Sequence, residues 1–137
     1  MPRRIFIAYA GEDRDQANGF RLLRWNINVE FTFFDRSLLS PVQSQDPDYI
    51  KRCIRDQMHG TSVTVVLIGE TTHSNDWVEW EIEESARRGN GLLGIRLKGH
   101  STARIPPALT KYGARTINWE PSNFEAAIER AAREAGR

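Results

Sequence analysis

The sequence predicts a three-layer α/β/α sandwich with a parallel five-stranded sheet in the middle layer. Short apolar runs rich in β-branched residues alternate with longer segments that show a helical repeat of apolar residues. This alternation is typical of parallel sheets that are covered by helices on both faces. The chain has 137 residues, of which 39% are hydrophobic and 27% are charged, as in ordinary soluble domains. We therefore expect residues 1–137 to form a single domain.

Five segments have the character of strands. The clearest is 62–68, which is nearly continuous in apolar and β-branched residues, as expected of a central parallel strand. The run 5–9 is closed by the loop signal Gly11-Glu12-Asp13 and reads as a strand buried on both faces. The remaining expected strands are 31–34, 91–97 and 115–119.

Four helices are expected between and after these strands. The first covers 15–25. The second begins with Asp48 as its N-cap and ends at Gly60. The third covers 76–88, where Asp76 and Glu79 form a capping-box pattern. A final helix is expected to begin at the cap Ser122. Residues 35–47 have no clear periodicity, and the link between the last two expected strands, broken at 105–107, is weak.

The favoured topology is the flavodoxin-like strand order 2-1-3-4-5. In such sheets ligands bind beyond the carboxyl ends of the strands, where the strand order reverses. The loops that begin at Ala10, Asp35 and Gly69 should therefore surround one crevice.

Composition excludes several classes of protein. The net charge of +1 gives no strong electrostatic drive toward nucleic acid or an anionic membrane. Cys53 is the single cysteine, so no internal disulfide can form and a reducing compartment is expected. No apolar stretch is long enough to span a bilayer, and the N-terminal run is too short for a signal peptide. We expect a cytoplasmic protein.

Several site types are disfavoured by the loops themselves. There is no G-x-G-x-x-G or Walker loop, and the acidic loop 10–15 would repel the phosphate of a flavin. A phospho-acceptor receiver domain needs an aspartate at the end of the third strand, where this chain has Gly69 and Glu70. The three histidines are scattered, without ligand partners at metal-site spacing, so no metal and no bound cofactor are expected.

The segment 76–88 contains one carboxylate without an evident structural role. Glu83 and Glu84 each have an arginine four residues later and are expected to form surface ion pairs, and Glu79 is the capping-box acid. Glu81 has no basic residue four positions away and lies one turn after Trp77. Held against the indole near the crevice, its carboxyl would be partly desolvated and its pKa raised. The alternative is that Glu81 is a solvated surface acid like its neighbours.

At this helix the sequence resembles a TIR domain. Trp77-x-x-x-Glu81 reproduces the W-x-x-x-E motif of that family, and the stretch 74–78 is similar to the residues just before it. The run 5–13 resembles the first TIR box, although Ala8 stands where many members have Ser. The run 33–35 resembles the strand before the family's mobile BB loop. Over residues 3–97 the pattern is most similar to the TIR-like branch that includes ThsB of the bacterial Thoeris antiphage system.

This resemblance implies an enzyme that cleaves NAD, its substrate rather than a cofactor, at the nicotinamide–ribose bond. It implies that Glu81 is the catalytic carboxylate and that the substrate-binding residues include Tyr9, Ala10, Asp35, Arg36, Ser74 and Trp77. The Thoeris branch further implies a signalling product, a cyclic ADP-ribose variant that reaches a separate effector protein, and self-association through the BB loop.

Two other functions remain open at this stage. The chain could be a non-catalytic TIR module that assembles with other proteins through its BB loop. It could also be a domain that senses a nucleotide or another metabolite and binds it without turnover. Glu81 at the motif position favours the enzyme, because a pure adaptor has no need of that carboxylate.

Overall fold

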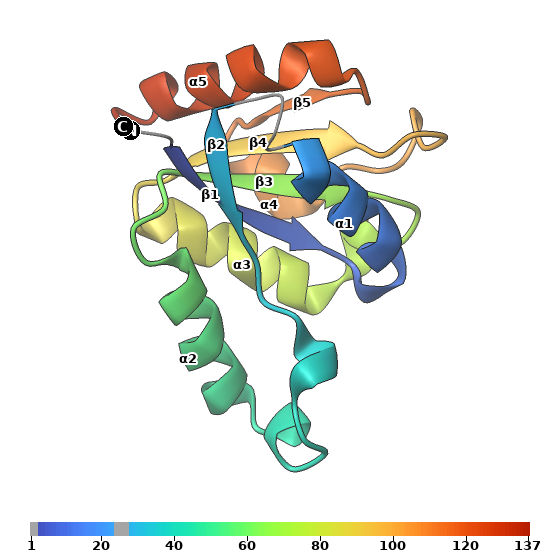
Figure 1. Ribbon diagram of the computed structural model, residues 1–137, viewed down its shortest axis with the longest axis vertical. Coiled ribbons are helices and arrows are strands. Elements are labelled where there is room, and N and C mark those ends of the chain that lie inside the picture. The colour runs from blue at the N-terminus through green and yellow to red at the C-terminus, as the bar shows by residue number, and fades with distance from the viewer. Residues whose placement is uncertain (1–2, 24–27) are drawn as a thin grey trace.

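The computed structural model describes residues 3–23 and 28–137 and shows a parallel five-stranded sheet between two layers of helices (Figure 1). The strand order is β2-β1-β3-β4-β5, as the sequence predicted, and every neighbouring pair is parallel. The strands are β1 (Arg3–Tyr9), β2 (Val29–Thr32), β3 (Val63–Ile68), β4 (Gly91–Arg96) and β5 (Arg115–Ile117).

The helices divide between the two faces of the sheet. The helices α1 (Arg14–Leu22) and α5 (Phe124–Glu134) cover one face, and α2 (Pro47–Met58), α3 (Asp76–Arg87) and α4 (Pro107–Lys111) cover the other. Alternate residues of β1 supply the two cores. Ile5 and Ile7 pack with Phe20 and Phe124 beneath α1 and α5. Phe6 and Ala8 belong to the core beneath α2 and α3.

The central strand positions the crevice. All six residues of β3 are buried, which explains why five of them are apolar, and the sixth, Thr64, forms a hydrogen bond with the hydroxyl of Ser85. Because β3 pairs with β1 from Val63 opposite Ile5 to Leu67 opposite Tyr9, the loops after both strands leave the sheet at the same edge. The sheet order reverses at this β1–β3 pair, so the edge is the expected place for a ligand.

Many element boundaries differ from the predicted ones by one or two residues. The predicted strand 31–34 is shifted toward the N-terminus, because pairing with β1 runs from Val29 to Thr32 and then stops. Phe33 and Phe34 leave the ladder and pack against the two cores instead. Helix α1 ends at Leu22 within the described chain, and the predicted helix end at Trp25 lies outside the described residues.

Three predicted helix caps are wrong. Helix α2 is capped by Asp46, which accepts a hydrogen bond of 3.1 Å from the backbone N–H of Tyr49, because Pro47 already occupies the first helical turn. Helix α3 is capped by Asn75, whose side chain accepts from the N–H of Val78 at 3.0 Å, rather than by Asp76. Helix α5 follows a short 3-10 turn, Pro121–Asn123, and the side chain of Ser122 does not cap it.

The predicted weak link between the last two strands contains the short helix α4, which the sequence analysis missed. The helix begins at Pro107 within the Pro-Pro pair and has only five residues, too few for a periodic pattern. Glu79 supplies a tertiary contact instead of the predicted capping box, since its Oε2 accepts a 2.9 Å hydrogen bond from the N–H of Ala108. Among the described helices, none is long and apolar enough to cross a membrane.

Candidate functional site

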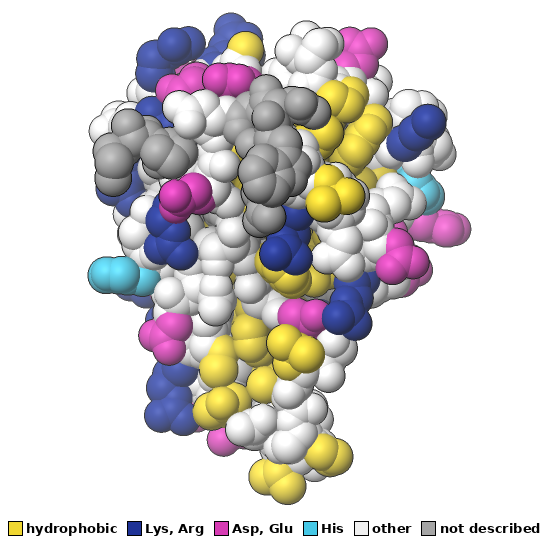
Figure 2. Space-filling model, in the orientation of Figure 1, with side chains coloured by type: hydrophobic (Ala, Val, Ile, Leu, Met, Phe, Trp, Pro, Cys, Tyr) yellow, Lys and Arg dark blue, Asp and Glu magenta, His cyan; other side chains and the backbone are white. Residues whose placement is uncertain are grey.

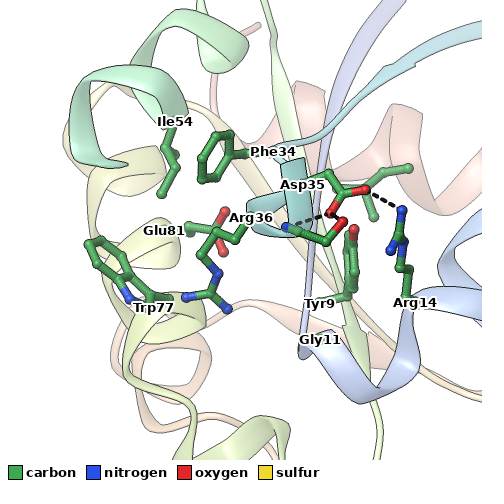
Figure 3. Close-up of a pocket in the computed structure, with 11 residues that line it drawn as sticks. Tyr9, Gly11, Arg14, Phe34, Asp35, Arg36, Ile54, Trp77 and Glu81 are labelled. Atoms are coloured by element: carbon green, nitrogen blue, oxygen red, sulfur yellow. Dashed lines mark hydrogen bonds and ion pairs between the residues drawn. The ribbon is translucent and has the colours of Figure 1, made fainter. Parts of the chain in front are cut away.

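A small cavity lies at the carboxyl edge of the sheet, between the loop after β1, the segment after β2 and helix α3 (Figure 3). Its volume is about 150 Å³. Five of the predicted site residues line it: Tyr9, Asp35, Arg36, Trp77 and Glu81. The other lining residues are Ile7, Gly11, Arg14, Phe34, Ser37 and Ile54.

Glu81 lies in the wall formed by α3. The residue is only 7% exposed, so the alternative that Glu81 is a solvated surface acid is wrong. Burial raises the pKa of Glu81 to about 8, and the positive charge of Arg36 opposes that rise. Within the described residues no hydrogen bond to its carboxylate contributes to this pKa. A buried carboxyl without a partner is costly to keep, and such groups cluster at functional sites.

Arg36 reaches across the cavity from the segment after β2. Its guanidinium carbon lies 5.7 Å from the centre of the Trp77 ring, at the distance of a cation–π contact. Figure 3 shows the side chain passing Glu81, with the guanidinium beside Trp77. The cavity therefore already contains one planar cation, set between an indole and a buried carboxyl.

Asp35 is fixed by contacts on both sides. Its Oδ1 accepts hydrogen bonds from the N–H and the hydroxyl of Ser37, at 3.0 and 2.6 Å, and its Oδ2 forms a 2.7 Å ion pair with Arg14. Burial alone would raise the pKa of Asp35, but these hydrogen bonds and the positive charge of Arg14 hold it below its ordinary value. Asp35 thus anchors the start of the segment that carries Arg36.

Tyr9 ends β1 and forms the floor beside this ion pair. Its ring packs against Phe33 with 5.9 Å between the ring centres. Burial raises the pKa of Tyr9 to about 12, and the negative charge of Asp35 adds to the rise. The phenol consequently stays protonated and can donate a hydrogen bond into the cavity.

Two predicted site residues do not line the cavity. Ala10 is buried, and its carbonyl accepts the N–H of Asp13 at the first turn after β1. Ser74 is exposed and its hydroxyl donates to the carbonyl of Thr71. Arg14 and Ser37 were not predicted. Arg14 could have been suspected from its place in the loop after the first strand, whereas the turn that brings Ser37 to Asp35 leaves no sequence signal.

The other glutamates of α3 are engaged elsewhere, and not in the predicted i,i+4 pairs. Glu84 is buried and binds Arg87, three residues later, and Arg55 of α2. Glu83 pairs with Lys111 at 3.1 Å and accepts a hydrogen bond from the hydroxyl of Tyr112. Both partners of Glu83 belong to the α4 region that the sequence analysis missed.

No metal-binding group is formed by three or more His, Cys, Asp or Glu side chains within residues 3–23 and 28–137. The polar and indole groups that line the cavity are two carboxyls, from Glu81 and Asp35, two guanidinium groups, the hydroxyl of Ser37, a phenol and an indole. Such a set can bind a planar or cationic ring and stabilise a positive charge that develops beside Glu81.

Sequence comparison identifies relatives of this chain. The family model described as "Thoeris protein ThsB, TIR-like domain" matches residues 6–102. A Bacillus cereus (strain MSX-D12) protein named "Putative cyclic ADP-D-ribose synthase ThsB1" is 39% identical over 64 residues, which are 47% of this chain and 33% of that protein. The chain thus spans about a third of the length of the curated relative it matches.

Solved structures agree with the fold. A response regulator receiver domain from Clostridium thermocellum aligns with a TM-score of 0.60 at 14% identity, over 98% of this chain and 97% of that one. The TIR domain of the Toll-related receptor TRR-2 from Hydra magnipapillata aligns with a TM-score of 0.55 at 15% identity, over 97% and 98%. A 2-desoxiribosyltransferase from Leishmania mexicana gives 0.55 at 17%, over 82% and 73%.

Proposed function

Since this chain belongs to the ThsB TIR-like domain family, we propose that it cleaves NAD at the nicotinamide–ribose bond, with Glu81 as the catalytic carboxylate. The observation that carries the proposal is the position of Glu81: the carboxyl is buried, has no hydrogen-bond partner among residues 3–23 and 28–137, and faces a cavity at the switch point of the sheet. A relative whose printed name is a cyclic ADP-D-ribose synthase supports the same chemistry.

The proposed reaction begins with breakage of the N-glycosidic bond. The bonding electron pair leaves with the nicotinamide nitrogen, so the pyridinium cation departs as a neutral base and needs no proton from an acid. The ribosyl C1′ is left with oxocarbenium character, as in glycoside hydrolysis. The ionised carboxylate of Glu81 stabilises this charge and accepts hydrogen bonds from the ribose hydroxyls.

The other lining residues orient the substrate in this proposal. Trp77 offers a ring face for stacking, and the protonated phenol of Tyr9 donates a hydrogen bond on the nicotinamide side. Arg14 supplies a positive charge on the wall opposite α3, suited to the diphosphate, beside Asp35. Ala10 and Ser74 lie outside the cavity lining, so the proposal assigns them no contact with the part of the substrate inside it.

The fate of the ADP-ribose unit depends on the nucleophile that attacks C1′. Water would give ADP-ribose and one proton. An adenine nitrogen or a ribose hydroxyl of the same molecule would give a cyclic isomer, again with release of one proton, and this is the product we propose. Such a nucleotide would act as a signal for a separate effector protein in antiphage defence.

Self-association is the second part of the proposal. Leu38 and Val42, in the segment between β2 and α2, are 80% and 81% exposed, and hydrophobic side chains gather at this end of the molecule in Figure 2. The same exposure also favours the alternative function, a non-catalytic TIR interaction module, because exposed apolar side chains mark contact surfaces.

One experiment separates these functions. Concentrated protein is incubated with NAD, and nicotinamide and the nucleotide products are resolved by chromatography. We expect the wild type and Glu83→Gln to release nicotinamide and Glu81→Gln to lose that activity. Glu83 is a matched control, since it lies on the same helix but pairs with Lys111 outside the cavity. Release that survives in Glu81→Gln would overturn the role of Glu81, and self-association without release would favour the module.

A further inference from the structure

Arg36 lies in the cavity where a positively charged ring of the substrate would have to bind. Its guanidinium is planar, stands 5.7 Å from the Trp77 ring centre and acts electrostatically on Glu81. The nicotinamide ring of NAD is also planar and cationic. The two groups would therefore compete for the same aromatic face and the same carboxylate.

The small volume of the cavity also indicates that Arg36 must move when a substrate binds. At about 150 Å³ it is smaller than the roughly 300–1,000 Å³ of pockets that hold small-molecule ligands. A nicotinamide ring with its ribose can enter only if lining side chains move aside. Arg36 is the first residue of a short 3-10 turn, Arg36–Leu38, and its side chain reaches across the cavity from there.

Arg36 is held less firmly than the charged groups around it. The short ion pair of this wall, 2.7 Å between Arg14 and Asp35, does not include Arg36. The contact of Arg36 with Trp77 is a cation–π contact, and its effect on Glu81 is through charge rather than a hydrogen bond. Contacts of this kind are individually weak and can be exchanged for those of another planar cation.

We propose that Arg36 is an internal competitor of the substrate: its guanidinium occupies the place of the charged ring beside Trp77 and Glu81, and a planar cationic ring must displace it to bind there. The proposal rests on the proposed function for the identity of that ring. Oxidised NAD carries such a cationic ring and can replace the contacts that Arg36 gives up with Trp77 and Glu81, whereas the neutral ring of NADH cannot.

Ligand-detected NMR titrations at pH 8 with two small probes test this inference. The probes are 1-methylnicotinamide, a planar cation, and nicotinamide, its neutral counterpart. We expect Arg36→Gln to bind the cationic probe about two- to fivefold more tightly than the wild type, the range of one surface cation–π contact, with little change for the neutral probe, which does not compete with the guanidinium. Arg36→Lys, which keeps the charge, should stay closer to the wild type.

Arg52→Gln is the control, because it removes one positive charge from α2 at an exposed position outside the cavity lining. It should leave the affinities for both probes unchanged. The inference is overturned if Arg36→Gln does not gain affinity for the cation, if both probes gain equally, or if no variant binds the cation. Nicotinamide release from NAD is measured separately. If Arg36→Gln gains affinity for the cationic probe but no nicotinamide is released from NAD, the proposed function is refuted and the inference about Arg36 stands. If nicotinamide is released but the affinity for the cationic probe does not rise, the inference is refuted and the proposed function stands.

Discussion

Replacing the buried carboxyl of Glu81 by an amide should stabilise the protein, and the gain should grow with pH. Folding raises the pKa of Glu81 from its ordinary value of 4.5 to about 8, so the folded state binds the proton more tightly than the unfolded state. Below pH 4.5 the side chain is neutral in both states and carries no penalty. Between pH 4.5 and 8 the unfolded chain ionises first, and stability falls by about 1.36 kcal/mol per pH unit.

The magnitude follows from these two pKa values. From pH 5 to pH 7 the wild type should lose about 2.5 kcal/mol of unfolding free energy relative to Glu81→Gln, because the amide does not titrate. By pH 9 the loss since pH 5 should reach about 4 kcal/mol. In a domain of this size the change between pH 5 and 7 corresponds to a difference in melting temperature of roughly 10 °C.

Urea denaturation of both proteins at pH 5, 7 and 9, without NAD, measures the difference directly. Glu83→Gln is the control. Its carboxyl has a lowered pKa because Tyr112 and Lys111 bond to it, so its contribution is present at neutral pH and is lost toward acid, the opposite direction. A stability difference between wild type and Glu81→Gln that stays constant from pH 5 to 9 would refute the burial of an ionisable, unpartnered Glu81.

Three further predictions concern the site and its supports. Nicotinamide release should increase as pH rises through about 8, because the ionised form of Glu81 is the active one; a flat pH–rate profile between 6 and 9 would argue against this role. Gly69→Ala should destabilise the fold by about 1–3 kcal/mol in urea titrations, since a Cβ at Gly69 would lie 2.4 Å from Asp13 Oδ2. In the Asp13→Ala background the same substitution should cost much less, because the clashing oxygen is gone. Equal losses from Gly69→Ala with and without Asp13→Ala would contradict the clash. Asn75→Ala should lower the free energy of unfolding by about 1 kcal/mol, because the side-chain cap of α3 is lost, whereas Asp76→Ala should lower it less. A larger loss for Asp76→Ala would instead support Asp76 as the cap.

Most of the fold could be predicted from the sequence, because the patterns that indicate strands and helices are local and repeat along the chain. Strand β3 is apolar except for Thr64, and the alternation of strands with helices left few topologies. Element ends were less predictable. The cap of α2 depends on whether Asp46 or Asp48 precedes the first helical turn, and only the backbone around Pro47 decides this. Helix α4 has five residues and is stabilised by a distant contact from Glu79, which no local pattern contains.

The site was predictable where a motif fixes helical spacing. Trp77 and Glu81 are one turn apart on α3, and the structure brings both to the cavity together with Tyr9, Asp35 and Arg36. The burial of Glu81 could not be derived from spacing, because it depends on how the segment after β2 folds back over α3. The partners of Glu83 and Glu84 were mispredicted for the same reason, since Arg55 and Lys111 come from other elements.

A crystal structure with carba-NAD, in which a methylene group replaces the ribose ring oxygen and blocks cleavage, tests the role of Glu81 most directly. The account predicts that Arg36 has left the Trp77 ring and that the Glu81 carboxylate lies at hydrogen-bond distance, about 2.6–3.2 Å, from a hydroxyl of the nicotinamide-side ribose. A dinucleotide bound with that ribose outside the cavity, and Glu81 still without a contact, would contradict it.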